Sequence, residues 1–386
     1  MLDQDIVFLN HGSFGATPKQ VFKEYVGWQE KLERQPVKFL GRDFDDHMNT
    51  SREILAAELQ TNANNLVYIP NATHGVNIVA QSLKLQPGDE ILTTDHEYGA
   101  CDYTWEFLCK KNGASYVRKA IPLPIADPEK VAQEFLTGIT ERTKVIFISH
   151  ITSPTAIKFP VEMICKVARE KGILTVVDGA HAFGQIDLAL DTLGADFYTS
   201  NCHKWALSPK GAAFLYVRPE VQPLVDPIVV SWGFGIEDFS KTGSRFVDFF
   251  QWAGTKDPAA YLSVPAAIAF SKENNWQDVR KKCKQYLDRT IADVTSLPGF
   301  ASIYSDNENY TQLASIQIPD QFDVAQLKSY LYEEHKVELP VLVWADKKMI
   351  RVSIQGYNNE EDIDALVKGL KTALRYFNIL ETKKVE

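Results

Sequence analysis

The chain of 386 residues lacks features that would point to several classes of protein. It has no apolar run near the roughly 20 residues that a membrane-spanning helix needs, since runs such as 228–230 are far shorter. It also has no excess of basic charge, because 41 Lys and Arg against 50 Asp and Glu give a net charge of −9. That balance argues against a non-specific nucleic-acid binder. Small molecules are therefore the expected partners, with neither nucleic acid nor a membrane among them.

The sequence also lacks a disulfide framework and the short motifs of several enzyme classes. Its five cysteines form no CxxC pair, so we expect reduced thiols that mostly fill the core. The acidic N-terminus, residues 1–5, has no signal-peptide pattern, and the expected location is cytoplasmic. There is no HExxH, no Walker lysine and no Gly-rich dinucleotide turn; "WGFG" at 232–235 is not in the setting that such a turn requires.

What the chain does contain is an alternation of strand and helix patterns through its middle. Helices are predicted at 73–83 and at 160–172, the latter opened by Pro160 and stopped by Gly172. The strand candidates between them are apolar at consecutive positions, which is typical of strands buried on both faces of a parallel α/β sheet. These candidates are 65–69, 90–94, 145–149, 173–177 and 197–200.

From about residue 260 the pattern changes to that of a smaller α+β unit. Short strands are predicted at 315–318 and 350–353, and helices at 257–274, 278–297, 323–335 and 360–377. We therefore predict an N-terminal arm over 1–15, a large domain over 16–256 and a small C-terminal domain over 257–386.

Polar, titratable and aromatic residues follow each predicted strand of the large domain. In parallel sheets, ligands bind outside the carboxyl ends of the strands. Five such segments would converge on one edge of the sheet, which predicts a binding site there. In chain order they are "PNATHGVN", "DHEYGA", "SHITSPT", "DGAHAFG" and "NCHKW".

The residue types in these segments indicate a particular chemistry. Asp178 ends a buried apolar strand, where a carboxylate is costly unless it pairs with a cation. Lys204 lies in an enclosed setting, where a lysine loses its proton readily and becomes a nucleophile for carbonyls. The predicted helix start at 73–75 offers free N–H groups to a phosphate. A carbonyl, a phosphate and a basic ring nitrogen together describe pyridoxal 5′-phosphate (PLP).

Simpler interpretations exist for each residue taken alone. A strand-end aspartate is often a turn former, a lone histidine a satisfied polar residue, and Tyr98 could be rim packing. Lys204 could extend its charged end to solvent. A zinc site is a further alternative, but no ligand spacing supports it and it leaves Lys204 unexplained, so we expect no metal. Its ligand set would be Asp178, His181, His203 and His150.

Four longer motifs resemble one known family over nearly the whole chain. They are "LNHGSFGATP" (9–18), "TDHEYGA" (94–100), "HITSPTA" (150–156) and "WAGTKDPAAYLSVPAAI" (252–268). With "DGAHA" and "HKW" between them, the chain resembles the class V aminotransferase-like, fold-type-I PLP-dependent enzymes. It is most similar to their isopenicillin N epimerase-like branch. The resemblance implies an aspartate-aminotransferase-like α/β fold, with a mainly parallel seven-stranded-type sheet and a smaller C-terminal α+β domain.

The resemblance also implies roles for individual residues. Lys204 would be the Schiff-base lysine, Asp178 would hold the pyridine nitrogen protonated, and His181 would lie near the phenolic oxygen. Tyr98 would stack on the ring. The further cofactor-binding residues would be Thr73, His74, Ser153, Asn201, His203 and, from the partner subunit of a homodimer, Thr255.

For the substrate, the resemblance implies that Arg351 binds the α-carboxylate through a bidentate contact, and Asn10 and His11 are candidates for the substrate pocket. Cysteine desulfurases carry a nucleophilic cysteine before that arginine, but the segment 338–350 contains none. Cys202 lies beside Lys204, but its side chain should point away from the cofactor. A persulfide-forming desulfurase is therefore disfavoured.

We expect an enzyme that acts at Cα of an amino acid through an external aldimine and a quinonoid. An epimerase-like reaction is the first hypothesis. A cysteine or sulfoxide C–S lyase or an aminotransferase is the alternative, and a catalytically degenerate binding protein on the same fold is a distant one.

Overall fold

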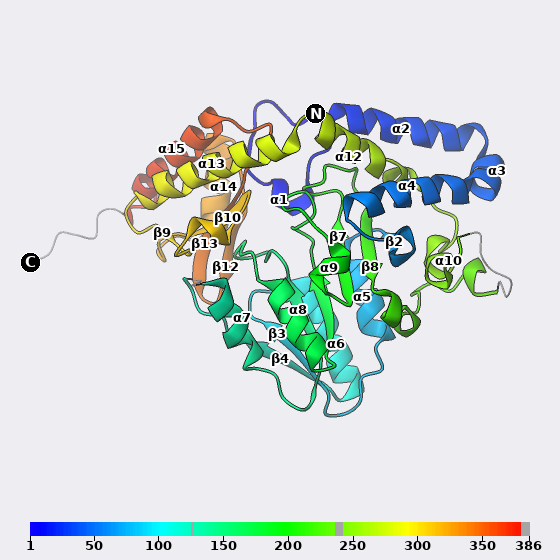
Figure 1. The fold of residues 1–386 in the computed structure, drawn as a ribbon. Coiled ribbons are helices and arrows are strands. Elements are labelled where there is room, and N and C mark those ends of the chain that lie inside the picture. Colours follow the sequence, from blue (N-terminus) through cyan, green and yellow to red (C-terminus); the bar gives the residue numbers. More distant parts are fainter. Residues whose placement is uncertain (125–126, 236–241, 380–386) are drawn as a thin grey trace, which may run out of the picture.

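The computed structural model describes residues 1–124, 127–235 and 242–379. Its largest sheet has seven strands in the order β2-β8-β7-β6-β5-β3-β4 (Figure 1). Neighbouring strands are parallel except for β8, which pairs antiparallel with both β2 and β7. The strands are β2 (Leu66–Ile69), β3 (Glu90–Thr94), β4 (Ser115–Lys119), β5 (Thr143–Ser149), β6 (Leu174–Asp178), β7 (Phe197–Asn201) and β8 (Ala213–Val217).

The two faces of this sheet bury alternate residues of each strand. In β5, Ile146 and Ile148 belong to one apolar cluster, and Val145 and Phe147 belong to another on the opposite face. This period of two, with both faces apolar, explains why the strands are apolar at consecutive positions. Helices of the large part cover the faces: α5 (Ala72–Ser82), α6 (Gly99–Asn112), α7 (Pro128–Leu136), α8 (Val161–Glu170), α9 (Leu190–Leu193) and α10 (Arg245–Gln251). Short 3₁₀ turns occur at η2 (Ala63–Asn65), η3 (Pro219–Leu224) and η4 (Trp232–Gly235).

The N-terminal segment connects the two halves of the molecule. β1 (Val7–Phe8) pairs in parallel with β11 (Val337–Glu338) of the C-terminal part. It leads into α1 (His11–Phe14), which reaches the centre of the structure (Figure 1). Gly15 then has a φ of 71°, and a Cβ there would lie 1.9 Å from the carbonyl oxygen of His203. The arm therefore packs closely on the segment that carries Lys204. It continues through α2 (Lys19–Arg34), α3 (Pro36–Lys38), the π-helical turn η1 (Phe39–Asp43) and α4 (Phe44–Glu58).

The C-terminal part is built on an antiparallel four-stranded sheet in the order β12-β13-β10-β9. Its strands are β9 (Ala301–Ser302), β10 (Leu313–Gln317), β12 (Val341–Trp344) and β13 (Lys347–Ser353). The helices are α11 (Ala259–Leu262), α12 (Val264–Glu273), α13 (Trp276–Thr295), the turn η5 (Asn307–Asn309), α14 (Val324–His335) and α15 (Glu360–Tyr376).

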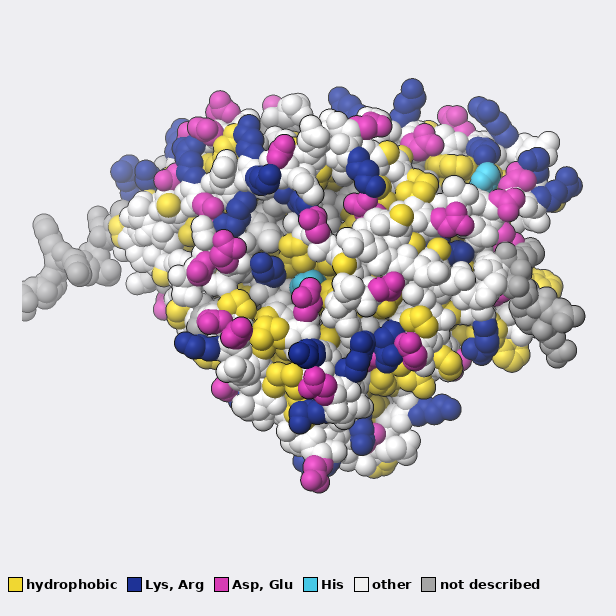
Figure 2. Space-filling view, in the orientation of Figure 1, with side chains coloured by type: hydrophobic (Ala, Val, Ile, Leu, Met, Phe, Trp, Pro, Cys, Tyr) yellow, Lys and Arg dark blue, Asp and Glu magenta, His cyan; other side chains and the backbone are white. Residues whose placement is uncertain are grey.

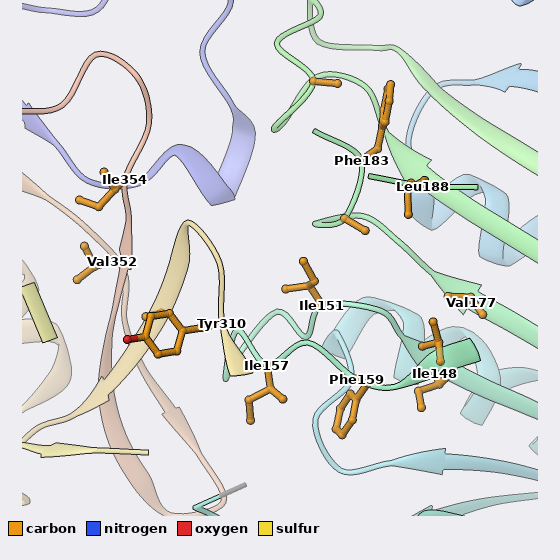
Figure 3. Packing of buried hydrophobic residues seen from close by; sticks show 14 of the residues in the cluster. Ile148, Ile151, Ile157, Phe159, Val177, Phe183, Leu188, Tyr310, Val352 and Ile354 are labelled. Atoms are coloured by element: carbon orange, nitrogen blue, oxygen red, sulfur yellow. The ribbon is translucent and has the colours of Figure 1, made fainter. Parts of the chain in front are cut away.

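One apolar cluster extends from the large sheet into the C-terminal part. Figure 3 shows Ile151 and Ile157, from the loop after β5, between Ile148 of β5 and the C-terminal residues Tyr310 and Val352. Because all of them belong to the same buried cluster, the loops at the strand ends are held on both sides. That packing makes the edge of the sheet a rigid base for a site.

The sequence predicted the fold class correctly, and most of its elements lie within a few residues of their predicted limits. The helix predicted at 257–274 is in fact two helices, α11 and α12. Pro265 has no N–H to donate to the carbonyl of Tyr261, so the helix cannot run through this point. Two strands of the large sheet, β4 and β8, were not predicted. The sequence of β4, SYVRK, is polar and partly exposed, which explains why it was missed. The domain limits 1–15, 16–256 and 257–386 stay predictions.

Acidic and basic side chains are interspersed over the face drawn in Figure 2. Within the described residues, this face shows no continuous basic surface of the kind that binds a nucleic-acid backbone. In the ranges that the structure describes, no helix combines the length and apolar character needed to cross a membrane. The cytoplasmic location stays a prediction.

Candidate active site

A cavity of about 370 Å³ lies where the ends of β5, β6 and β7 meet the starts of α5 and α6. This is the edge at which a mainly parallel sheet binds ligands. Eight residues singled out from the sequence line it: Thr73, Tyr98, Ser153, Asp178, His181, Asn201, His203 and Lys204. The rest of the lining consists of Ser13, Phe14, Pro70, Asn71, Ala72, Ser149, Ile151, Ala180 and Gly211.

Asp178 ends β6 and is buried against the cavity. Its Oδ1 accepts a hydrogen bond from the N–H of Ala180 at 2.9 Å, and its Oδ2 lies 3.6 Å from the thiol of Cys101. Burial raises the pKa of the Asp178 carboxyl, while the Ala180 hydrogen bond and the charge of Lys204 lower it. Because a thiol is a weak donor, Oδ2 keeps the capacity to accept a stronger bond, for example from a protonated ring nitrogen.

Lys204 follows β7 in a turn, and its amine reaches the same cavity. Burial, assisted by the charge of Arg351, lowers the pKa of Lys204 to about 8, with Asp178 acting in the opposite direction. Its Nζ lies 3.3 Å from Nε2 of His181. Its carbonyl oxygen lies 3.0 Å from Nε2 of His11, which anchors the backbone at this point. A lysine with this pKa is partly neutral near pH 7 and can act as a nucleophile or a base.

The start of α5 forms the other end of the cavity. Asn71 caps the helix by accepting a hydrogen bond from the N–H of His74 at 2.8 Å, and the N–H of Ala72 donates to Oδ1 of Asn201 at 2.9 Å. Gly75 permits a close approach to β7, since a Cβ there would lie 2.3 Å from Oγ1 of Thr199. The positive end of the helix dipole is therefore fixed beside Thr73, where an anion would be stabilised.

His203 lies near this end on the segment that follows β7. Its Nδ1–H donates to the carbonyl oxygen of Ala212 at 3.1 Å, which fixes the ring. Burial lowers the pKa of His203 to about 4, so the side chain is neutral, and the residue lines the cavity. A nearby phosphate dianion would favour protonation of this ring.

Arg351 reaches the site from β13 of the C-terminal sheet. Its Nη1 donates to the carbonyl oxygen of Ser153 at 2.6 Å and to the Ser153 hydroxyl at 3.1 Å, and Nη2 donates to the Ser13 hydroxyl at 3.2 Å. Both serines line the cavity. The buried Nε of Arg351 has no partner among the described residues. The guanidinium can therefore still bind a carboxylate.

Tyr98 lies at the mouth of the cavity as the N-cap of α6 and is 46% exposed. Burial lowers the pKa of Arg351 to about 10, and the electrostatic interaction with Tyr98 acts in the opposite direction. Tyr98 therefore borders the same cavity as Asp178 and Lys204.

Besides Arg351, which contacts the cavity-lining Ser13 and Ser153, four residues predicted for the site do not line the cavity. His74 is one position beyond it on α5, and Thr255 is exposed on the segment before α11. His11 is fully buried between the Lys204 carbonyl and the hydroxyl of Tyr357, 3.0 Å from each. Asn10 accepts a hydrogen bond from Ser13, the serine that contacts Arg351. His11 and Asn10 thus support Lys204 and Arg351, and their direct contact with substrate stays a prediction.

Several residues of the site were not predicted. Asn71 carries a signal that could have identified it, because an asparagine three residues before His74 is a typical N-cap. Cys101 and Trp205 carry none, since they reach Asp178 and His181 only after folding. Glu97 is also buried here and accepts hydrogen bonds from Thr94 at 2.6 Å and Ser149 at 2.5 Å.

The rejected zinc set does not form: His150 bonds the Tyr198 hydroxyl at 2.9 Å, and no cluster of potential metal ligands occurs among the described residues.

The chain is similar to known proteins over nearly its whole length. It is 30% identical over 379 residues to the isopenicillin N epimerase of Streptomyces clavuligerus, covering 96% of this chain and 95% of that one. It is 26% identical over 408 residues to a probable chloroplastic L-cysteine desulfhydrase of Arabidopsis thaliana, covering 97% and 84%. Among solved structures, C-DES with glycine covalently linked to its PLP cofactor superposes with a TM-score of 0.82 at 21% identity, covering 95% and 96%.

The cavity suits PLP on its own geometry. Asp178 Oδ2 can accept a ring N–H, the Lys204 amine can condense with an aldehyde, and the start of α5 can receive a phosphate. The model of the aminotransferase class-V family matches residues 12–366. The chain therefore belongs to the aminotransferase class-V family of PLP-dependent enzymes.

Proposed function

We propose that the protein removes the Cα proton of an amino-acid substrate, with Lys204 as the base. The observation that carries this proposal is the state of Lys204, whose amine lies in the cavity with a pKa of about 8. When bound, PLP supplies a carbonyl that condenses with amines and a ring that delocalises negative charge from Cα. In its neutral form, the Lys204 amine holds a lone pair ready to accept a proton at the cavity floor.

The other side chains have complementary tasks in this proposal. Asp178 holds a proton on the ring nitrogen through Oδ2, and this makes the ring a stronger electron acceptor. Arg351 would bind the substrate carboxylate and thereby fix the orientation of Cα in the cavity. His181 would donate a hydrogen bond to the phenolic oxygen of the cofactor.

Epimerisation is the first candidate for the outcome. It is supported by the 30% identity to the isopenicillin N epimerase over 96% of this chain. Epimerisation needs a proton donor on the face of Cα opposite Lys204. Tyr98 is the phenol among the cavity-lining residues and is our candidate for that donor.

C–S lysis is the second candidate, supported by the relative named a probable L-cysteine desulfhydrase. In this reaction Lys204 accepts the Cα proton, the Cβ–S bond breaks with loss of sulfide, and a Cα=Cβ double bond forms. Water then hydrolyses the resulting 2-aminoacrylate to pyruvate and ammonia. It requires a single base, which Lys204 supplies. A desulfurase is disfavoured because 338–350 has no cysteine and all five cysteines are buried. Transamination is a third outcome, and a binding protein without activity is disfavoured because Lys204, Asp178 and Arg351 are all present.

We also propose that the protein is a homodimer with shared sites. Support comes from large apolar side chains that are exposed around the cavity and beyond it. Phe14 at the cavity is 72% exposed, and Trp232 and Phe234 in η4 are 78% and 69% exposed. Exposed apolar side chains that lie together mark interaction surfaces, and Trp232 and Phe234 belong to the same turn. Thr255 is exposed as well, as expected for a residue that serves the partner's phosphate.

The experiment that tests the proposal is incubation of the purified protein with a panel of amino acids in D₂O. Epimerisation incorporates deuterium at Cα and converts one enantiomer into the other without another product. C–S lysis releases sulfide, pyruvate and ammonia, and transamination yields a keto acid with retention of the β-substituent. The Tyr98→Phe variant should lose epimerisation and retain lysis. If no amino acid exchanges its Cα proton, the proposal is wrong.

A further inference from the structure

Trp205 makes a contact with His181 that determines which ring nitrogen of the histidine carries a proton. Nε1 of Trp205 lies 3.2 Å from Nδ1 of His181. An indole nitrogen is a donor only, so Nδ1 of His181 must be the acceptor. Burial lowers the pKa of His181 well below its usual value, so the ring is neutral. Its single proton therefore lies on Nε2, and the tautomer follows from the partner.

The protonated Nε2 is the atom that faces Lys204, at 3.3 Å from Nζ. A lysine ammonium has only donors, and Nε2–H is a donor too. The contact is therefore a hydrogen bond only when Lys204 is a neutral amine that accepts it. With the other tautomer, Nε2 would accept from the ammonium and would favour the charged lysine.

We propose that Trp205 is a positioning residue that holds His181 as an Nε2–H donor and thereby keeps Lys204 in its neutral, reactive form. The proposal concerns the preparation of Lys204 and holds for each outcome considered above. It rests on PLP as the cofactor, but not on the reaction that follows Cα deprotonation.

The surroundings of Trp205 hold its indole in one place. The side chain is fully buried, and its ring centroid lies 5.0 Å from that of His11. Gly184 lies against its backbone, since a Cβ there would approach the Trp205 carbonyl carbon to 2.3 Å. A buried indole in this protein does not always have a hydrogen-bond partner. The indole nitrogens of Trp28, Trp105 and Trp276 are buried without one among the described residues.

Other charged and titratable groups act on Lys204 as well. Arg351 on β13 lowers the pKa of Lys204, and Asp178 on β6 and Cys101 on α6 raise it. His11 on α1 contributes to lowering the pKa of His181. None of these groups is itself replaced in Trp205→Phe, and the comparison of backgrounds in the second test below separates the tautomer from other effects on Lys204.

The first test is ¹⁵N NMR of the full-length protein labelled at histidine, with and without cofactor. His181→Gln identifies the His181 signals. We expect an unprotonated Nδ1 and a protonated Nε2 in the wild type, and loss of that pattern in Trp205→Phe. The matched control is Trp344→Phe, which removes an indole donor that binds the Asp95 carbonyl at 2.7 Å; it should leave His181 unchanged. A protonated Nδ1 in the wild type would overturn the proposal, whether or not Trp205→Phe folds.

The second test measures the rate of PLP uptake by the cofactor-free protein between pH 6 and pH 10, followed by absorbance. The rate should rise with pH through the pKa of Lys204, because only the neutral amine reacts. In Trp205→Phe we expect the midpoint to move up by about one unit, leaving about tenfold less neutral amine at pH 7. In a His181→Gln background, whose amide can still donate, Trp205→Phe should cause no further shift. An unmoved midpoint in a folded Trp205→Phe, or the same shift in both backgrounds, would contradict the proposal.

Discussion

The two ends of the cavity are built in different ways. At the end formed by Asp178, Lys204 and His181, the side chains are held by hydrogen bonds from the same chain, through Ala180 and Trp205. At the end formed by Thr73 and Tyr98, the side chains are partly exposed, and Thr255 lies outside the cavity. One folded chain is therefore enough to set the reactivity of Lys204 and of the cofactor ring. We propose that a second chain completes the phosphate-binding site and covers the opening of the cavity.

The largest effect is expected from Asp178→Asn, at the end of the cavity formed by Asp178, Lys204 and His181. The amide cannot hold the ring nitrogen protonated, and the barrier to Cα proton removal should rise by about 4 kcal/mol, roughly a thousandfold in rate. Cα hydrogen exchange measures the rate, and absorbance should show that the cofactor stays bound. Asp196→Asn is the control, because Asp196 is as deeply buried but pairs with Arg218 away from the cavity. Near wild-type exchange in Asp178→Asn would show that this end does not work as described.

A second effect concerns the free energy of unfolding and involves Glu97, which accepts a hydrogen bond from the cavity-lining Ser149. Burial raises the pKa of Glu97 to about 8, so the folded protein keeps a proton that the unfolded chain loses near pH 4.5. The stability contribution of Glu97 is therefore present at low pH and is lost as pH rises through about 8. Glu97→Gln mimics the protonated acid and should avoid this loss. Relative to the wild type, the variant should gain on the order of 3 kcal/mol of unfolding free energy between pH 5 and pH 8.

Urea unfolding at the two pH values measures this difference. Glu106→Gln, at an exposed glutamate of α6, is the control for replacing a carboxyl by an amide outside the cavity. A difference between Glu97→Gln and the wild type that is the same at pH 5 and pH 8 would mean that Glu97 is already ionised in the folded protein.

The smallest effect is expected from Thr255→Ala, which tests the end of the cavity formed by Thr73 and Tyr98. Loss of one hydrogen bond to a charged phosphate should weaken cofactor binding by about 2 kcal/mol, near thirtyfold. The decisive experiment mixes Thr255→Ala with Lys204→Ala. If Thr255 serves the neighbouring chain, one of the two sites in the mixed dimer is fully wild type, and activity should exceed that of both parents.

Mass spectrometry must first establish that mixed dimers form in that experiment. If they form, Thr255→Ala alone is impaired and activity still stays at the parental level, Thr255 acts within its own chain. The contrast between the two ends would then have to be abandoned.

The same contrast explains how much could be predicted from the sequence. Lys204 and Asp178 follow apolar strands, and a charged residue at the end of a buried strand is a strong signal. Apolar residues at consecutive positions indicated five strands of the large sheet, because both faces of these strands are buried. They are β2, β3, β5, β6 and β7. The edge strand β4 lacks such a signal, because its sequence is polar and partly exposed. Pro265 did carry a signal for the helix break, since it has no N–H to donate, but the predicted helix over 257–274 did not take it into account.

The contacts that hold the site residues in place could not be predicted from the sequence, for a different reason. Trp205 to His181 spans 24 positions and Cys101 to Asp178 spans 77, so their meeting depends on the completed fold. His11 shows the converse. The sequence drew attention to it, but folding turns its ring toward the Lys204 carbonyl and away from the cavity.

The central claim is that Lys204 is the residue that bonds to the cofactor. Reduction of the PLP-loaded protein with borohydride, followed by proteolysis and mass spectrometry, tests it directly. Lys256 is the informative competitor, because burial lowers its pKa to about 8 as well. We predict that the reduced cofactor is found on the peptide containing Lys204 and is absent from that position in Lys204→Ala. Its attachment to Lys256, or to no lysine at all, would contradict the account.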